Sequence, residues 1–362
     1  MTGQHRIVVL GAGYAGLSAA RRLAKKARGA QVTVVDARAQ FIERVRLHQR
    51  VAGQPLRQWE LARVLGDQGI DFVCARATDL DPAARTVGLD TGRVLSYDSL
   101  IYALGSTAPH DVPGVAEFAR SADTADAADW QVEGAGPVAI VGTGATGIEL
   151  STELAESHPG TRVLLLGTDE PGAWLGAEAV AHIRAVLDRL GVEVRTDVKV
   201  VEVTPQGPRL ADGTVVPAAA TVWATGFAVP DLAARAGIAV DALGRVRTDR
   251  FLRSLSHPDI HAAGDCALIE GPGGRELRMA CATALPTGKH AADTVAARLG
   301  GAQPAELRFR YYLQCLSLGR QDGLIHQLRA DDTPGRFMLR GRAAALVKEQ
   351  VVRSAVVAAG LR

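Results

Sequence analysis

The chain has 362 residues, more than one ordinary hydrophobic core organises, so we expect two domains and an appendage. Its 41 basic and 39 acidic side chains leave a net charge of +2, which gives no reason to expect a nucleic-acid partner. No apolar run reaches membrane-spanning length, and residues 7–10 are too short for a signal-peptide core. The four cysteines are scattered without a pair spacing. They predict reduced thiols in a cytoplasmic protein, with no disulfide framework and no metal site.

The chain opens with a strand, a glycine turn, a helix and a second strand. Residues 7–10 are a continuous apolar run, as expected for a parallel strand buried on both faces. Residues 11–16 fit G-x-G-x-x-G, in which small residues let a pyrophosphate approach the start of the helix at 17–27. Asp36 ends the second strand where a carboxylate accepts hydrogen bonds from a ribose. This order favours a dinucleotide site over a glycine turn that only packs a helix on a sheet.

The same plan is used a second time. Residues 71–103 predict an antiparallel meander, and a Pro/Gly/Ala-rich linker follows from about 108 to 137. A strand at 138–141, a second G-x-G-x-x-G at 142–147 and a helix to about 157 then repeat the opening pattern. A strand at 162–166, a helix at 177–190 and a meander at 192–216 complete the unit. Two fingerprints predict two dinucleotides, one tightly held flavin and one exchanging nicotinamide.

The second fingerprint lacks its acidic partner. The strand at 162–166 is followed by Gly167, and no arginine stands there either. Asp169 or Glu170 could reach a ribose hydroxyl, whereas Thr168 beside a small residue would leave room for a 2′-phosphate. The sequence leaves NADH and NADPH open.

After residue 227 the chain is expected to return to the first domain. A strand at 260–263 ends in Gly264-Asp265, and a helix follows at 284–299. Three β-like runs (309–317, 323–328 and 336–339) then precede a terminal helix at about 343–359. An amphipathic helix can lie on a membrane, but this one lacks Trp or Phe anchors and a strongly basic face. We therefore favour packing within the protein or a homodimer interface.

The order of these motifs resembles the flavoproteins with two dinucleotide-binding domains. Within that group it is most similar to type II NADH dehydrogenase-like and apoptosis-inducing-factor-like proteins, over about residues 6–300. The resemblance implies an α/β fold with two Rossmann-like domains, the NAD(P) domain inserted into the FAD domain, and a small α+β C-terminal domain. The implied boundaries are 1–112 with 228–300 for FAD, 113–227 for NAD(P), and 301–362 for the C-terminal domain, which would serve as a dimer interface or the acceptor side.

FAD and NAD(P)H are the cofactors that this resemblance implies. It places Glu149 near the contact between nicotinamide and flavin, and His48 on the loop beneath the flavin, as the catalytic candidates. A surface acid and a satisfied structural histidine are the alternatives. Arg44 and Arg46 would bind phosphate or an anionic flavin, unless they belong to a solvated loop. The predicted cofactor contacts are Gly11, Ala12, Gly13, Tyr14, Ala15, Gly16, Asp36, Ala37, Arg38, Arg44, Arg46, Ala77, Ala103, Leu104, Gly105, Gly142, Thr143, Gly144, Ala145, Thr146, Gly147, Thr168, Thr225, Gly226, Gly264, Asp265 and Ala284.

The predicted activity is hydride transfer from NAD(P)H to FAD and electron transfer onward to a quinone-like or other small acceptor. Disulfide exchange needs two adjacent thiols, and no close cysteine pair occurs, so Cys266 and Cys281 are interpreted as packing residues. The glutamines of the family's quinone site are absent from residues 281–288. Two alternatives stay open: an FAD-dependent oxidase or dehydrogenase of a small biosynthetic substrate, and an FAD-binding redox sensor with negligible turnover.

Overall fold

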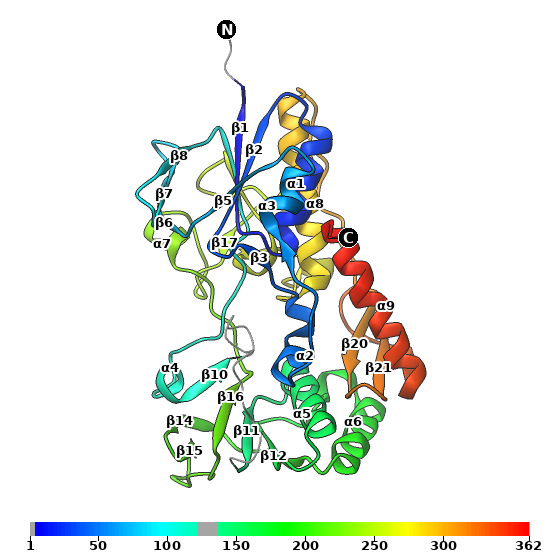
Figure 1. Ribbon diagram of the computed structural model, residues 1–362. Coiled ribbons are helices and arrows are strands. Elements are labelled where there is room, and N and C mark those ends of the chain that lie inside the picture. Colours follow the sequence, from blue (N-terminus) through cyan, green and yellow to red (C-terminus); the bar gives the residue numbers. More distant parts are fainter. Residues whose placement is uncertain (1–3, 122–135, 362) are drawn as a thin grey trace.

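A computed structural model of the chain describes residues 4–121 and 136–361. Figure 1 shows one parallel sheet in the upper part of the molecule and a second in the lower part. The C-terminal strands and the last helix lie along one side, beside both parts. None of the described helices is both long and apolar enough to cross a membrane.

The first sheet has the strand order β18-β9-β1-β2-β5, with every pair parallel. Its strands are β1 (Arg6–Leu10), β2 (Gln31–Asp36), β5 (Asp71–Cys74), β9 (Ser99–Tyr102) and β18 (Ile260–Ala262). Strand β1 is central, which explains why Ile7 to Leu10 are all apolar and at most 3% exposed. Because β18 joins from residue 260, the chain does return to this sheet after an insertion. Helices α1 (Tyr14–Lys26) and α8 (Cys281–Leu299) pack together beside the sheet.

The second sheet repeats the first, with the order β10-β16-β11-β12-β13, again all parallel. Its strands are β10 (Ala119–Ser121), β16 (Ala220–Trp223), β11 (Val138–Val141), β12 (Val163–Leu166) and β13 (Glu193–Arg195). Helices α5 (Ala145–Ser157) and α6 (Ala177–Arg189) pack on one face through Ile148, Leu150, Ile183 and Leu187. The predicted α/β fold with two Rossmann-like units and an inserted second domain is confirmed.

Several predicted elements differ from the structure in their partners or their bounds. Only β6 (Ala77–Asp81), β7 (Thr86–Leu89) and β8 (Val94–Ser96) form the first antiparallel meander, since β5 and β9 are parallel strands of the main sheet. The second meander is reduced to the hairpin of β14 (Val200–Thr204) and β15 (Gly207–Leu210). The predicted linker contains α4 (Val115–Phe118) and β10, while its residues 122–135 lie outside the described part. The hydrophobic pattern of a short strand is the same whichever strand it pairs with. The sequence therefore could not predict the pairing partner.

The C-terminal part is an antiparallel sheet covered by one helix. Strands β20 (Leu313–Ser317), β21 (Gly323–Leu328) and β22 (Pro334–Arg340) pair in chain order, and α9 (Gly341–Ala359) packs against them. The end of α9 reaches the first domain, where Val356, Ala359 and Leu361 join its core. The terminal helix therefore packs within the protein, as predicted. The remaining α-helices and strands of the described residues are β3 (Gln40–Phe41), α2 (Leu47–Val51), β4 (Trp59–Glu60), α3 (Leu61–Gly66), α7 (Leu232–Arg235), β17 (Val246–Arg247) and β19 (Ala267–Leu268).

Candidate functional site

The first fingerprint forms a turn that only glycine fits. Gly11 has φ +98°, and a Cβ atom there would lie 2.3 Å from the carbonyl oxygen of Ala103. A Cβ atom on Gly16 would lie 1.8 Å from the carbonyl oxygen of Gly11. Helix α1 begins directly after Gly13 with no side-chain cap, so the N–H groups of its first turn are open to a phosphate.

Asp36 lies beside this turn. Its Oδ2 atom accepts a hydrogen bond from the backbone N–H of Ala12 at 2.7 Å, and its Oδ1 atom accepts one from the N–H of Arg38 at 2.9 Å. Ala37 lies between Asp36 and Arg38 in the chain, directly after the end of β2. A carboxylate held at the fingerprint, next to a free helix N-terminus, fits the ribose and pyrophosphate of an adenine dinucleotide.

Residues distant in sequence close the other side of this site. The hydroxyl of Ser106 donates to Oδ2 of Asp265 at 2.7 Å, and Nη1 of Arg44 donates to the carbonyl oxygen of Ser106 at 2.8 Å. Gly264 has φ +74°, and a Cβ atom there would lie 3.0 Å from Cβ of Ala15 and 3.9 Å from Cβ of Ala284. The segments 103–106, 264–265 and 284, all of them among the predicted cofactor contacts or next to one, therefore meet at the start of α1. Ala77, another predicted contact, opens β6 and packs against the first core.

The second fingerprint has the same geometry. A Cβ atom on Gly147 would lie 1.8 Å from the carbonyl oxygen of Gly142, and one on Gly142 would lie 2.7 Å from that of Ala224. Thr225 also adjoins this turn, with its Cβ atom 3.0 Å from the position of a Cβ on Gly142. Helix α5 begins after Gly144 without a side-chain cap. Both domains thus present a phosphate-binding turn, and these residues fit FAD in the first and a nicotinamide dinucleotide in the second.

A group of charged side chains lies where the two domains meet the C-terminal part. We call His48, Glu149, Glu153, Arg320 and Lys348 the junction cluster. Nζ of Lys348 lies 2.8 Å from Oε1 of Glu149, and Nη2 of Arg320 lies 2.9 Å from Oε2 of Glu153. Nδ1 of His48 is 3.8 Å from Glu149, and its Nε2 atom is 4.0 Å from Glu153. The cluster joins α2, α5, the β20–β21 turn and α9.

Burial sets the protonation of the junction cluster. Burial would raise the pKa of Glu149, but the ammonium group of Lys348, together with His48 and the N–H of Ser317, holds that pKa below its usual value. Burial would lower the pKa of Lys348, and the carboxylate of Glu149 raises it instead. Burial lowers the pKa of His48 to about 4, so this imidazole is neutral at pH 7. Burial also raises the pKa of Glu153. The site therefore holds an ion pair of Glu149 and Lys348 beside a neutral histidine.

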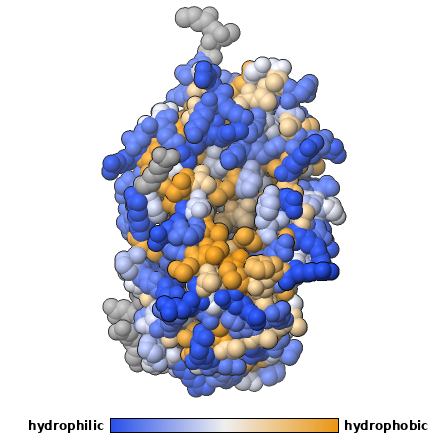
Figure 2. Space-filling view, turned by 90° about the vertical axis from the view of Figure 1, so that its right-hand side faces the viewer, coloured by the Kyte–Doolittle hydropathy of each residue, from blue (hydrophilic) through white to orange (hydrophobic). Residues whose placement is uncertain are grey.

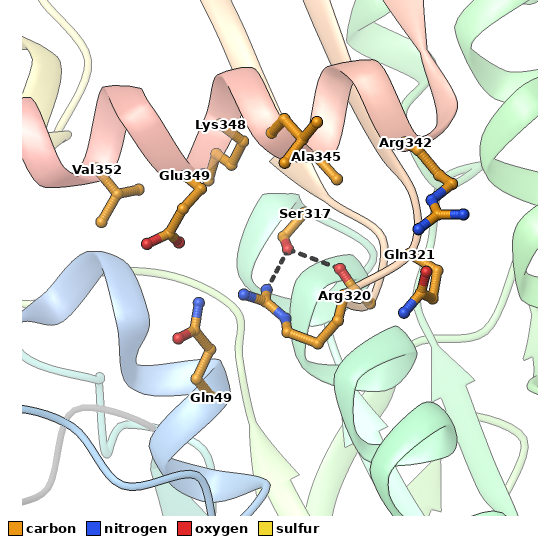
Figure 3. A pocket seen from close by; sticks show the side chains of 11 residues that line it. Gln49, Ser317, Arg320, Gln321, Arg342, Ala345, Lys348, Glu349 and Val352 are labelled. Carbon is orange, nitrogen blue, oxygen red and sulfur yellow. Dashed lines mark hydrogen bonds between the residues drawn. The ribbon is translucent and has the colours of Figure 1, made fainter.

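A pocket of about 320 Å³ reaches this cluster. Figure 3 shows its walls, which come from α2, the β20–β21 turn and the first half of α9. Lys348 and Arg320 belong both to the pocket and to the cluster, and Nη2 of Arg320 donates to the hydroxyl of Ser317 at 2.6 Å. The lining residues are Gln49, Ser317, Gly319, Arg320, Gln321, Arg342, Ala345, Leu346, Lys348, Glu349 and Val352.

Apolar side chains gather on the face that carries α9, near the middle of the view in Figure 2. On this helix Leu346 is 70% exposed and Val357 is 51% exposed. Leu346 also lines the pocket, so an apolar surface borders a pocket whose lining includes the charged side chains of Arg320, Lys348 and Glu349.

The structure brings His48 and Glu149 together, although they are about a hundred residues apart in sequence. Arg46 contacts two carboxylates, Glu43 at 2.9 Å and Glu349 at 2.7 Å, which favours a structural role over phosphate binding. Glu153, Arg320 and Lys348 were missed. Glu153 stands four residues after Glu149 on the same helix face, and Lys348 is the one lysine between residues 301 and 362, but neither pattern is specific.

Comparison with known proteins agrees with this geometry. Residues 5–288 match the family model described as pyridine nucleotide-disulphide oxidoreductase. An NADH dehydrogenase-like protein of Mycobacterium tuberculosis is 34% identical over 344 residues, which covers 87% of this chain and 86% of that protein. The type II NADH:quinone oxidoreductase Ndh of the same organism is 28% identical over 366 residues, covering 85% of this chain and 76% of that one.

Solved structures show the same fold. The sulfide:quinone oxidoreductase from Aquifex aeolicus superposes with a TM-score of 0.84 at 18% identity, covering 99% of this chain and 92% of that one. NDH2 from Plasmodium falciparum in complex with NADH gives a TM-score of 0.82 at 14% identity, covering 99% and 97%.

The fold and the paired fingerprints define a flavoprotein with two dinucleotide-binding domains. The chain belongs to the pyridine nucleotide-disulphide oxidoreductase family. It is an FAD-dependent NAD(P)H oxidoreductase, and the predictions of family, enzyme class and both cofactors are confirmed.

Proposed function

We propose that this protein oxidises NADH and delivers the electrons to a quinone-type small acceptor. The observation that carries the proposal is the ion pair of Glu149 and Lys348, because Glu149 follows the second fingerprint on α5 while Lys348 lines the pocket. One pair thus connects the nicotinamide domain with a space that can admit an acceptor. The relatives named as NADH dehydrogenase-like protein and type II NADH:quinone oxidoreductase support this assignment.

The protein's own residues position the reactants. The turn at Gly11–Gly16 with Asp36 would hold FAD, and the turn at Gly142–Gly147 would hold the nicotinamide dinucleotide. Bound FAD supplies the hydride-accepting chemistry. Reduction of a quinone consumes protons, and Nζ of Lys348 can hold one at the pocket wall with Oε1 of Glu149 2.8 Å behind it.

Two glutamines in the pocket support a quinone-type acceptor within this proposal. Gln49 and Gln321 line it from α2 and from the β20–β21 turn, so two amides are available to a quinone oxygen although residues 281–288 supply none. A small acceptor with polar oxygens is the class that suits these walls.

The remaining assignments belong to the same proposal. They are the domain boundaries 1–112 with 228–300, 113–227 and 301–362, the roles of Glu149 and His48, a cytoplasmic location, and self-association through the C-terminal domain. The apolar face of α9 is compatible with a homodimer contact.

Anaerobic reduction of the purified protein, followed at the flavin absorbance band, tests the proposal. NADH should bleach the flavin rapidly, and a short-chain quinone added afterwards should restore the oxidised spectrum. Bleaching without recovery by any quinone would refute the acceptor. A flavin that dithionite reduces but neither nicotinamide does would refute the activity and favour the oxidase alternative.

A further inference from the structure

The two domains can be superposed residue by residue at the fingerprint, because their hydrogen bonds correspond. The N–H of Gly11 donates to the carbonyl oxygen of Val35 at 2.7 Å, and the N–H of Gly142 donates to that of Leu166, also at 2.7 Å. The residue after each acceptor is therefore equivalent, which pairs Asp36 with Gly167. By the same alignment, Ala12 corresponds to Thr143.

In the second domain, the side chain of Thr143 occupies the space that the side chain of Asp36 occupies in the first. A Cβ atom on Gly167 would lie 2.7 Å from both Cγ2 and Oγ1 of Thr143, and 3.2 Å from its Cβ atom. Thr143 is only 7% exposed and its branched side chain is stiff, so rotation would leave at least one branch in the way. The pair excludes any side chain at position 167, including the acid that would bind a ribose 2′-hydroxyl.

The acidic residues that follow Gly167 in the chain do not replace the missing carboxylate. Glu170 is held by Arg184, with two hydrogen bonds of 2.7 Å, and Glu193 is held by Arg195 at 2.6 Å. The main chain also holds Gly167 in place, because its N–H donates to the carbonyl oxygen of Arg195 at 3.1 Å.

Asp169 remains, two residues after Gly167. It is exposed and accepts a hydrogen bond from the hydroxyl of Thr168 at 2.9 Å. Surrounding water weakens the interaction of its charge with a nearby phosphate, and the two ion-paired acids carry balancing arginines. The edge of the second site therefore holds no fixed carboxylate for a 2′-hydroxyl, and the exposed Asp169 repels a 2′-phosphate only weakly.

From this contact we propose that the nicotinamide site accepts NADPH and NADH with similar affinity, and that Thr143 and Gly167 together determine this. The inference rests on the proposed function, since it presupposes a nicotinamide dinucleotide in the second domain. It goes beyond that function because it names the residues that set the choice of nucleotide.

The test is calorimetric titration of the FAD-loaded enzyme with NAD⁺ and NADP⁺, which bind without reducing the flavin. The wild-type dissociation constants should agree within about threefold. The double variant Thr143→Ala/Gly167→Asp should favour NAD⁺ by about tenfold or more, because the new carboxylate accepts from the ribose and repels the phosphate. Thr143→Ala alone should leave the ratio unchanged. Gly167→Asp alone should lower the melting temperature more than the double variant does, which measures the steric contact without any nucleotide.

Each result decides the matter. A wild-type preference of more than about threefold for either nucleotide would overturn the inference while leaving the proposed function standing. Equal tolerance of Gly167→Asp with and without the Thr143 change would overturn it on structural grounds. If neither nucleotide binds, the inference and the proposed function both fail, and this outcome is distinct from the other two.

Discussion

Replacing Lys348 by methionine removes the cation of the junction cluster while keeping the length of its side chain. Glu149 then loses a cationic partner at 2.8 Å and keeps the backbone N–H of Ser317 at 3.0 Å and the neutral imidazole of His48 at 3.8 Å. The two side chains of the pair are 15% and 13% exposed, so the carboxylate would be left mostly buried and unpaired.

We expect this loss to cost about 3 kcal/mol, the low end for breaking a buried ion pair, because some solvent reaches it. At roughly 2.1 cal/mol/K of unfolding entropy per residue, a cooperative chain of 362 residues loses about 4 °C of melting temperature. The effect depends on pH. Lys348 holds the pKa of Glu149 down, so the stabilisation is present above the unfolded pKa and is lost as the pH falls through the folded one. In the variant burial raises that pKa, so the stability deficit should shrink on going from pH 8 to pH 5.

Thermal unfolding followed by circular dichroism measures both expectations. Lys348→Met/Glu149→Gln should recover most of the lost stability, because the buried charge is gone. Lys26→Met is the matched control, since Lys26 contacts Asp293 at 2.8 Å but is 47% exposed and should change the melting temperature by less than about 1 °C. A change in Lys348→Met as small as the control's, or no recovery in the double variant, would refute the reasoning.

Two further predictions concern the FAD site and the buried histidine. Gly16→Ala should abolish FAD binding, because the added Cβ would lie 1.8 Å from the carbonyl oxygen of Gly11. The ratio of flavin to protein absorbance after purification measures the bound FAD. Gly66→Ala is the control that should keep its flavin, since a Cβ atom there has no neighbour within 4 Å. His48 has its pKa lowered to about 4 by burial, so between pH 6.5 and 4 the unfolded chain binds a proton that the folded one does not, and stability falls as the pH falls. His48→Gln should remove up to about 3 kcal/mol of that decline, and equal slopes of melting temperature against pH in both proteins would contradict it.

The dinucleotide-binding units were predictable because their determinants are local. Strand, glycine turn, helix and acid follow one another within about thirty residues, and each constraint acts between near neighbours, as Gly16 does against Gly11. Residues 260–265 were also identified, since a buried strand ending in Gly-Asp carries its own pattern. These segments determined the fold class, the family and both cofactors from sequence.

Strand pairing was decided by tertiary structure. Residues 119–121 and 193–195 became parallel edge strands of the second sheet, although the sequence suggested a linker and a meander. Alternation along a strand reports which face is buried, and it carries no information about the partner strand.

The sequence by itself determined the two glycine turns that are expected to bind phosphate, because each turn is made by contiguous residues. Only the tertiary structure decided what surrounds those turns. Thr143 fills the space beside Gly167 from 24 positions away, and Lys348 meets Glu149 across 199 positions. In the sequence, a single charged residue on a helix looks the same whether its side chain is solvated or buried. Its ion-pair partner can be identified only in the folded structure, where distant elements pack together and exclude water.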